Sequence, residues 1–380
     1  MNVFICPRCQ NLDLHKIGFK QGQPYCRACI EFQAESWVPM IREKKAVQIH
    51  LGYALTEEQQ RISQGLIACY RQQQSAMVDA VTGSGKTEIV FGLIQVALAE
   101  GKRIGFVIPR RDVVIEMLPR FQLVFPNLTI TTVFGGHHDL LEADVVILTT
   151  HQIFRYENYF DVLIFDEVDA FPYAGNPVLA AMVKRALKGM VIYLSATFEK
   201  DQLMAFAKQG GKVFHLFKRY HGHPLPELTV IIRPFLFKWL TLIRWLFQFK
   251  KAQSPVFIFV PTIAIGQWLL PWVKLFFPTT KLAFASSVDR DEVVQRFKTN
   301  PDFFLITTAI LERGITLSNL QVIIFEADHP LYTTSMLIQM AGRVGRKLNS
   351  PTGNVVLLAN HRHPHIINAQ AKIRFANLHM

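Results

Sequence analysis

The sequence predicts an α/β protein with two parallel-sheet domains, preceded by a small cysteine-rich module. Three observations lead to this prediction. Short apolar runs alternate with longer helix-like segments, this alternation occurs in two separate blocks, and four of the five cysteines form two close pairs near the start of the chain. Strand–helix alternation is typical of right-handed βαβ units, whose parallel strands are buried on both faces. A chain of 380 residues is long enough for two or three domains.

The composition divides the chain into five segments. We expect a cysteine-rich module at residues 1–35, a mixed linker at 36–50, a first α/β domain at 51–215, a connecting segment at 216–250 and a second α/β domain at 251–380. The aromatic and basic character of the connecting segment is compatible with a linker, a nucleic-acid contact or a partner surface.

Apolar runs in both blocks are the strand candidates. In the first block they are residues 75–79, 103–109, 129–134, 145–149, 162–165 and 190–194. Segments with helical periodicity, such as 87–100 and 177–187, lie between them. The second block repeats the alternation, with strand candidates at 254–261, 281–286, 303–308, 321–327 and 354–360. We therefore expect two domains of the same architecture.

The composition limits the classes of function. Hydrophobic residues make up 50% of the chain and charged residues 18%, which excludes a disordered protein. Lysine and arginine exceed aspartate and glutamate by 41 − 29 = 12, which indicates a polyanionic partner or simply a basic solvated surface. We see no signal peptide, and Arg233, Lys238 and Arg244 interrupt the most apolar later stretch, at 230–249. We therefore expect a soluble protein in a reducing compartment.

A phosphate-binding loop is predicted at residues 80–87, AVTGSGKT, between a strand candidate and an apolar helix. Glycines let backbone N–H groups surround phosphate oxygens, and the helix N-terminus adds a positive dipole end. Ala80 replaces the first glycine of the usual pattern. We expect Lys86 to reach the β- and γ-phosphates of ATP and the Thr87 hydroxyl to bind Mg²⁺. The candidate nucleotide-binding residues of this loop are Thr82, Gly83, Ser84, Gly85, Lys86 and Thr87.

Two carboxylates follow the strand candidate at 162–165. We expect Asp166 to contact Mg²⁺ and Glu167 to polarise the attacking water as general base. A pair of acidic residues is otherwise only a helix-start signal. The tripeptide at 195–197, Ser-Ala-Thr, follows another strand candidate and could transmit the nucleotide state to the acidic motif, with a plain helix cap as the alternative.

Two arginines near the C-terminus complete the candidate catalytic set. Arg343 and Arg346 stand three residues apart among glycines, and we expect them on one helix face. Guanidinium groups suit the spread charge of a phosphoryl-transfer transition state. Since they belong to the second block, they would have to act across an interdomain cleft that ATP closes. The alternative is a basic surface helix.

These motifs together resemble a superfamily 2 helicase motor with two RecA-like domains. The matching segments, in chain order, are 80–87, 109–111, 149–151, 166–169, 195–197, 307–316 and 339–346. The resemblance implies that Gln59 recognises adenine and that Gly314 belongs to the nucleotide site. It also implies that residues 109–111 and 149–151, together with Thr307 and Thr308, contact the nucleic-acid backbone.

The cysteine pairs predict a metal site. Cys6 and Cys9 are separated by 16 residues from Cys26 and Cys29, and each pair has CxxC spacing, which is typical of a Cys₄ zinc ribbon. Four thiolates leave no open coordination position, so the Zn²⁺ would be structural, and so small a module needs metal to fold. A redox dithiol or disulfides are the alternative. Cys69 is interpreted as a small buried apolar residue.

A Cys₄ module ahead of the loop sequence AVTGSGKTE is similar to the ComFA family, the late-competence ATPases of Gram-positive bacteria. PriA helicases share the TGSGKTE loop but carry their zinc ligands late in the chain. The resemblance implies an ATP-driven single-stranded DNA translocase that draws transforming DNA into the cytoplasm. It also implies a cytoplasmic location at the inner face of the membrane, with a ComFC-like partner and a DNA-uptake channel.

Two other functions remain open from the sequence. A replication-restart or repair helicase that unwinds duplex DNA would share every motor motif. A zinc-stabilised, nucleotide-switched binding protein without motor activity would instead turn over ATP slowly and without response to DNA.

Overall fold

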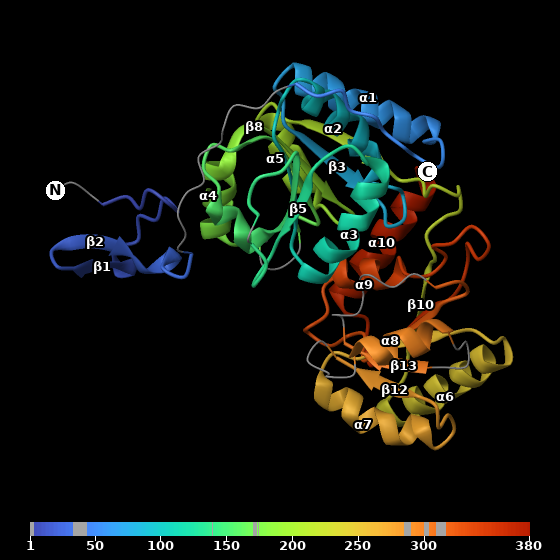
Figure 1. Ribbon diagram of the computed structural model, residues 1–380. Helices are drawn as coiled ribbons and strands as arrows, with labels where there is room; N and C mark the ends of the chain where they lie inside the picture. Colours follow the sequence, from blue (N-terminus) through green and yellow to red (C-terminus); the bar gives the residue numbers. More distant parts are fainter. Residues whose placement is uncertain are drawn as a thin grey trace. The chain divides into compact units, whose positions relative to one another are not determined.

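The computed structural model describes residues 4–32, 44–138, 140–169, 173, 175–284, 290–299, 304–308 and 317–380 (Figure 1). Contacts within the chain define two units. The first comprises the described parts of 1–80 and 85–216, and the second comprises 81–84 with the described parts of 217–380. Each unit contains a parallel sheet, which confirms the predicted α/β class.

The sheet of the first unit has seven strands in the order β5-β6-β4-β7-β8-β3-β9, and every neighbouring pair is parallel. The strands are β3 (Ala76–Ala80), β4 (Ile104–Ile108), β5 (Ile130–Val133), β6 (Val145–Thr149), β7 (Phe160–Asp166), β8 (Leu187–Ser195) and β9 (Lys212–Leu216). Because β8 lies between β7 and β3, the carboxyl ends of these three strands meet at one edge of the sheet. Ligands bind at this edge in open parallel sheets.

Helices cover both faces of this sheet. One face packs against α1 (Glu57–Arg71), α2 (Phe91–Ala99) and α3 (Arg111–Val124). The other packs against α4 (Pro177–Ala186) and the 3₁₀ segment η4 (Thr150–Arg155). Strand side chains alternate between the faces; in β4, Phe106 and Ile108 belong to the first core and Val107 to the second. The remaining elements are η3 (Glu88–Val90), which precedes α2, and α5 (Lys200–Lys208).

The cysteine-rich module consists of an antiparallel hairpin of β1 (Ile17–Lys20) and β2 (Gln23–Cys26), with short 3₁₀ turns η1 (Leu14–Lys16) and η2 (Arg27–Cys29). Within residues 4–32 the buried side chains are the four cysteines. The module therefore has no apolar core of its own in this part, which agrees with a fold that depends on its cysteines.

The second unit has a six-stranded parallel sheet in the order β10-β15-β14-β11-β13-β12. The strands are β10 (Leu228–Ile232), β11 (Val256–Phe259), β12 (Lys281–Ala283), β13 (Phe304–Thr307), β14 (Gln321–Phe325) and β15 (Val355–Ala359). Helices α8 (Arg290–Thr299), α9 (Thr334–Ala341) and α10 (Pro364–Leu378) pack on one face. Helices α6 (Phe235–Lys251) and α7 (Ile263–Lys274) lie together on the other (Figure 1).

The segment at 216–250, described above as a connection, contributes β10 and α6 to the second unit. Strand β10 pairs in register with β15 over five residues, from Leu228 with Val355 to Ile232 with Ala359. Helix α6 buries Leu242 and Leu246 at helical spacing. Lys238, one of the basic residues that interrupt the apolar stretch, is fully buried and forms an ion pair with Glu326. Within the described residues no helix is both long and apolar enough to cross a bilayer.

Candidate functional site

The loop after β3 has the backbone shape of a phosphate-binding loop. Gly83 and Gly85 both have φ of +79°, in the left-handed region that favours glycine. A Cβ atom at Gly85 would also lie 2.3 Å from Nε2 of Gln59, so space as well as φ requires glycine there. Thr87, the last residue of the loop, and Glu88, which follows it, are buried at the start of η3.

Lys86 and the acidic motif come together in the first unit. The Lys86 Nζ atom lies 2.7 Å from Oδ1 of Asp166 and 4.0 Å from Oε1 of Glu167. Burial disfavours the charged lysine, but the nearby carboxylates, above all Asp166, more than offset this and hold the pKa of Lys86 above its ordinary value. The ammonium group is therefore charged at neutral pH and is held at the carboxyl end of β7.

Glu167 adopts an unusual backbone conformation. Its φ is +57°, and its N–H donates a 2.8 Å hydrogen bond to the carbonyl of Leu194 on the neighbouring strand β8. A non-glycine residue in this region is strained, and such strain persists mainly where it serves function. Here the turn keeps the two consecutive carboxylates of Asp166 and Glu167 on the same lysine.

The Ser-Ala-Thr motif contacts the acidic motif directly. The hydroxyls of Ser195 and Thr197 both donate hydrogen bonds to the carboxylate of Asp169. The Thr197 N–H also donates to Ser195 Oγ at 3.0 Å. The alternative of a plain helix cap is wrong, since the following helix α5 is capped by Glu199. The contact with Asp169 provides a physical connection for the predicted transmission between the two motifs.

Gln59 lies in the first turn of α1, beside Gly85 of the phosphate loop. It is buried, and its Oε1 accepts from the Thr56 N–H at 2.9 Å, while the Gln59 N–H donates to Thr56 Oγ1 at 3.3 Å. This is a capping box, so part of the role of Gln59 is to start α1. A carbonyl oxygen can accept a second hydrogen bond, and Nε2 lies beside Gly85. The geometry is therefore compatible with adenine recognition as well.

Sequence reasoning missed a buried cluster around Glu88. The Glu88 carboxylate is 4% exposed and accepts hydrogen bonds from the Tyr53 hydroxyl, at 2.9 Å, and from the Arg120 guanidinium. Burial alone would lower the pKa of Arg120, but the Glu88 charge holds it above its ordinary value. The cluster ties α3 to the residue that follows the loop. The sequence signal was an acidic residue placed directly before the apolar residues Ile89 and Val90.

The residues predicted to contact nucleic acid differ in exposure. Arg111 is exposed and stacks on the Phe134 ring at 4.9 Å, while Arg110 is partly buried and pairs with Asp112 at 3.7 Å. His151 is exposed, and its ring stacks with that of Phe32 in the cysteine-rich module at 6.1 Å and 15°.

The threonines of the same motifs are buried. This set comprises Thr149, Thr150, Thr307 and Thr308. The contacts that these threonines are predicted to make with nucleic acid stay a prediction. Gly314, together with residues 309–316 of its motif, lies outside the described residues.

The two arginines of the second unit lie beyond the helix on which we expected them. Helix α9 ends at Ala341, Gly342 is its C-cap, and Gly345 has φ of +68°. The prediction of a shared helix face was wrong, because the two glycines terminate the helix and turn the chain. Arg343 is buried, and Arg346 donates from Nε to the Gly342 carbonyl at 2.8 Å.

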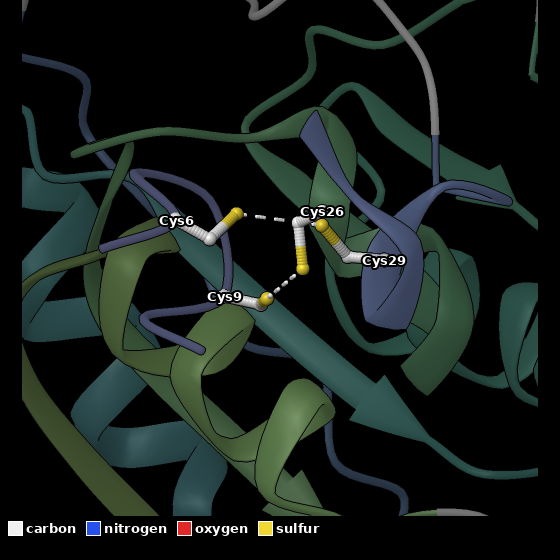
Figure 2. Close-up of side chains that lie close together, drawn as sticks. All are labelled: Cys6, Cys9, Cys26 and Cys29. Atoms are coloured by element: carbon white, nitrogen blue, oxygen red, sulfur yellow. Dashed lines mark hydrogen bonds between the residues drawn. The ribbon is translucent and has the colours of Figure 1, made fainter. Parts of the chain in front are cut away.

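The four N-terminal cysteines form one cluster (Figure 2). Their sulfur atoms all lie within 4.8 Å of one another, with 3.6 Å between Cys6 and Cys29 and 3.6 Å between Cys9 and Cys26. Tetrahedral Zn²⁺ with Zn–S bonds of about 2.3 Å requires sulfurs about 3.8 Å apart. A disulfide would need about 2.0 Å, and all four cysteines are free. The cluster is therefore compatible with Zn²⁺.

Comparison with known families agrees with this arrangement. Residues 52–200 match the family described as type III restriction enzyme, res subunit, and residues 238–347 match the helicase conserved C-terminal domain. Among solved structures, Saccharomyces cerevisiae Dbp5 bound to RNA and ADP BeF3 is similar, with a TM-score of 0.59 and 16% identity over 85% of this chain and 92% of that one. RecG bound to a three-way DNA junction has a TM-score of 0.58 and 19% identity over 86% and 45%. These structures support the fold, two RecA-like domains.

Two curated relatives extend over nearly the whole chain. The competence protein ComFA of Streptococcus pneumoniae is 33% identical over 98% of this chain and 90% of its own length. ComFA of Bacillus subtilis is 31% identical over 98% and 85%. The chain therefore belongs to the ComFA family of competence proteins, and it is an ATP-hydrolysing enzyme of the superfamily 2 helicase type.

Proposed function

We propose that this protein is an ATP-driven translocase on single-stranded DNA that supports the import of transforming DNA. The observation that carries the proposal is the ion pair of Lys86 with Asp166 and Glu167, at the end of a parallel sheet, in a chain related to ComFA over nearly its whole length. This relationship favours DNA import over a repair helicase, although both would share the motor.

The first step is the binding of ATP with Mg²⁺. Lys86 is proposed to bind the β- and γ-phosphates, and Thr87 and Asp166 to hold the metal ion. Mg²⁺ supplies charge neutralisation on the phosphates when it is bound. Since Lys86 lies 2.7 Å from Asp166, nucleotide binding must exchange this ion pair for the lysine–phosphate and carboxylate–metal pairs. The loop residues Thr82, Gly83, Ser84 and Gly85 are proposed to surround the phosphates, and Gln59 to bind adenine.

The second step is hydrolysis. Glu167 is proposed to take the proton of the attacking water, and its strained backbone keeps the carboxylate within 4.0 Å of Lys86 Nζ. Arg343 and Arg346 are proposed to stabilise the charge of the transition state. The hydrogen bonds from Ser195 and Thr197 to Asp169 would pass a change at the acidic motif to the end of β8.

The roles of Glu167 and Lys86 predict two different defects. Glu167→Gln should lower kcat by at least about 100-fold while ATP affinity is kept, because only proton transfer is lost. Lys86→Ala should weaken ATP binding itself. Both are measured by steady-state ATPase assays and equilibrium nucleotide binding. Glu116→Gln, at an exposed carboxylate of α3, serves as the matched control. Full activity of Glu167→Gln would exclude it as the general base.

A translocase grips the phosphate backbone rather than base edges, since it must move along any sequence. The net charge of +12 suits this grip. We expect the ATPase rate to rise with single-stranded DNA and to fall as salt weakens DNA binding. The logarithm of the binding constant should fall with the logarithm of the salt concentration, with a slope of about −0.7 per phosphate contact. Parallel titrations with single-stranded DNA, duplex DNA and RNA measure this. A rate that no nucleic acid changes would contradict the motor, and robust strand displacement would favour the repair helicase.

We propose that the four cysteines hold one structural Zn²⁺. Cys9→Ser should abolish zinc binding and unfold the hairpin of β1 and β2, because the described module buries little else. Basal ATP hydrolysis should persist, since the nucleotide residues lie outside the module. Metal analysis and ATPase assays measure both effects, with Cys69→Ala, a buried cysteine outside the cluster, as control. Zinc retained at full stoichiometry in Cys9→Ser would contradict the site.

We further propose a cytoplasmic location on the inner face of the membrane. Helices α6 and α7 expose a surface of aromatic and aliphatic side chains, which comprises Phe237, Leu240, Phe247, Ile263, Trp268, Trp272 and Leu275. Exposed Lys250 and Lys251 lie at the end of α6, and the sequence has no acidic residue between Glu227 and Asp289. A surface that exposes both tryptophan and lysine side chains fits the headgroup region of an anionic bilayer. A ComFC-like partner and a DNA-uptake channel are proposed from the family alone.

Vesicle flotation tests this location. The protein should float with phosphatidylglycerol vesicles and much less with phosphatidylcholine vesicles, because the surface is basic as well as apolar. The double variant Trp268→Ala/Trp272→Ala should lose most of this binding. Phe375→Ala, which removes an exposed aromatic ring from α10, is the matched control. Equal binding by the tryptophan variant and the unmodified protein would contradict a role of this surface.

A further inference from the structure

Arg219 binds the backbone of the turn that carries Arg343 and Arg346. Its side chain is 1% exposed. Nη1 donates to the Gly345 carbonyl at 2.8 Å, and Nη2 donates to the carbonyls of Val344, at 3.0 Å, and Gly342, at 3.3 Å. One guanidinium group therefore holds three main-chain carbonyls within four residues.

The next two side chains act on the same turn. The Tyr220 hydroxyl donates to the Arg346 carbonyl at 2.9 Å, and His221 Nε2 donates to the Gly345 carbonyl at 2.9 Å. With Arg219, these three consecutive residues form a clasp, defined here as residues 219–221. The clasp binds the main chain of the turn at four positions, and one of these carbonyls, that of Gly342, also accepts from Nε of Arg346 at 2.8 Å.

The turn needs such donors for a physical reason. Carbonyls at the end of a helix have no helical partner, and buried carbonyls must find another one. Two glycines also make the turn intrinsically flexible. A planar guanidinium with five N–H donors can hold several carbonyls at once, which a lysine cannot do in the same geometry. A Cβ at Gly345 would come within 3.0 Å of Arg219 Nη1, so the glycine also makes room for the clasp.

We propose that Arg219 is a positioning residue for ATP hydrolysis, which fixes the turn at 342–346 and thereby the orientation of Arg343 and Arg346. The inference rests on the proposed role of these two arginines. Arg219 Nε also donates to the Thr82 carbonyl of the phosphate loop at 3.2 Å, and Arg219 is not assigned a contact with the nucleotide.

The clasp lies directly after the point in the chain where the first unit ends. Strand β9, the last strand of the first unit, ends at Leu216, and the second unit resumes at Phe217. The segment that joins the two units is thus bonded, within five residues, to the arginine-bearing turn. A conformational change in the joining segment would therefore alter the turn through these hydrogen bonds. Burial, and then the charge of Arg346, lower the pKa of Arg219 to about 10, so the guanidinium stays charged at neutral pH.

The test compares Arg219→Lys with the unmodified protein. We expect kcat to fall by at least about tenfold, with the KM for ATP and the affinity for single-stranded DNA little changed, since a misplaced arginine affects mainly the transition state. Arg103→Lys, at a buried arginine of the first unit, is the matched control and should keep its kcat. Unchanged kcat in Arg219→Lys, or equal losses of kcat and DNA binding, would overturn the inference.

A second variant tests the clasp without a substitution at the buried arginine, which could itself disturb folding. Tyr220→Phe/His221→Ala removes two donors to the same turn at side chains that are partly exposed. It should fold normally by circular dichroism and still lower kcat several-fold without a change in the KM for ATP. A folded double variant with the kcat of the unmodified protein would overturn the clasp.

A double-mutant comparison identifies the route of the effect. If Arg219 acts through the turn, adding Arg219→Lys to Arg343→Lys should lower the residual kcat little further. Multiplying losses would show that Arg219 acts elsewhere and would overturn the inference. A failure of the proposed translocase appears differently, as ATP hydrolysis in the unmodified protein that does not respond to DNA. Basal kcat of the Arg219 variant still reports on the clasp in that case.

Discussion

The ion pair between Lys86 and Asp166 depends on the order of the strands. Lys86 follows β3 and Asp166 ends β7, and the 2.7 Å contact between them spans the intervening strand β8. Parallel strands bring their carboxyl ends to one edge of the sheet. The sheet alone therefore brings together two residues that are 80 positions apart in the sequence. Strand β8 ends with Ser195, which binds Asp169. The sheet order thus sets the neighbours of each motif, and the nucleotide chemistry follows from these neighbours.

The two units use a similar strand end in different ways. In each, a glutamate with positive φ follows a central parallel strand: Glu167 after β7, with φ of +57°, and Glu326 after β14, with φ of +53°. Glu167 shares the loop lysine with Asp166, whereas Glu326 pairs with the fully buried Lys238 of α6. A carboxylate paired with a fully buried lysine is committed to that ion pair, because separating the two would leave a buried charge without a partner. This difference agrees with the proposal that the hydrolytic carboxylate belongs to the first unit.

Much of the fold could be predicted because its signals are local. Buried parallel strands appear as short apolar runs, and the predicted strand at 145–149 coincides with β6. The loop, the carboxylates and the cysteine pairs are contiguous motifs, which is why their chemistry was visible. The clusters that hold them were not visible, since they join distant residues: Glu88 with Tyr53 and Arg120 is an example. Helix α6 was ambiguous because the burial of Lys238 depends on a partner 88 residues later.

The residues that identify the arginine motif do not by themselves hold its two arginines in place. The glycines that identify the motif also end α9 and leave a segment with little intrinsic stiffness. Catalysis by a guanidinium group requires the opposite, a side chain held near its working position before the reaction begins. The stiffness must come from outside the motif, and residues 219–221 supply it through the main chain. Since these hydrogen bonds reach carbonyls rather than side chains, they act on the turn whatever residues it carries, and the motif alone does not encode them.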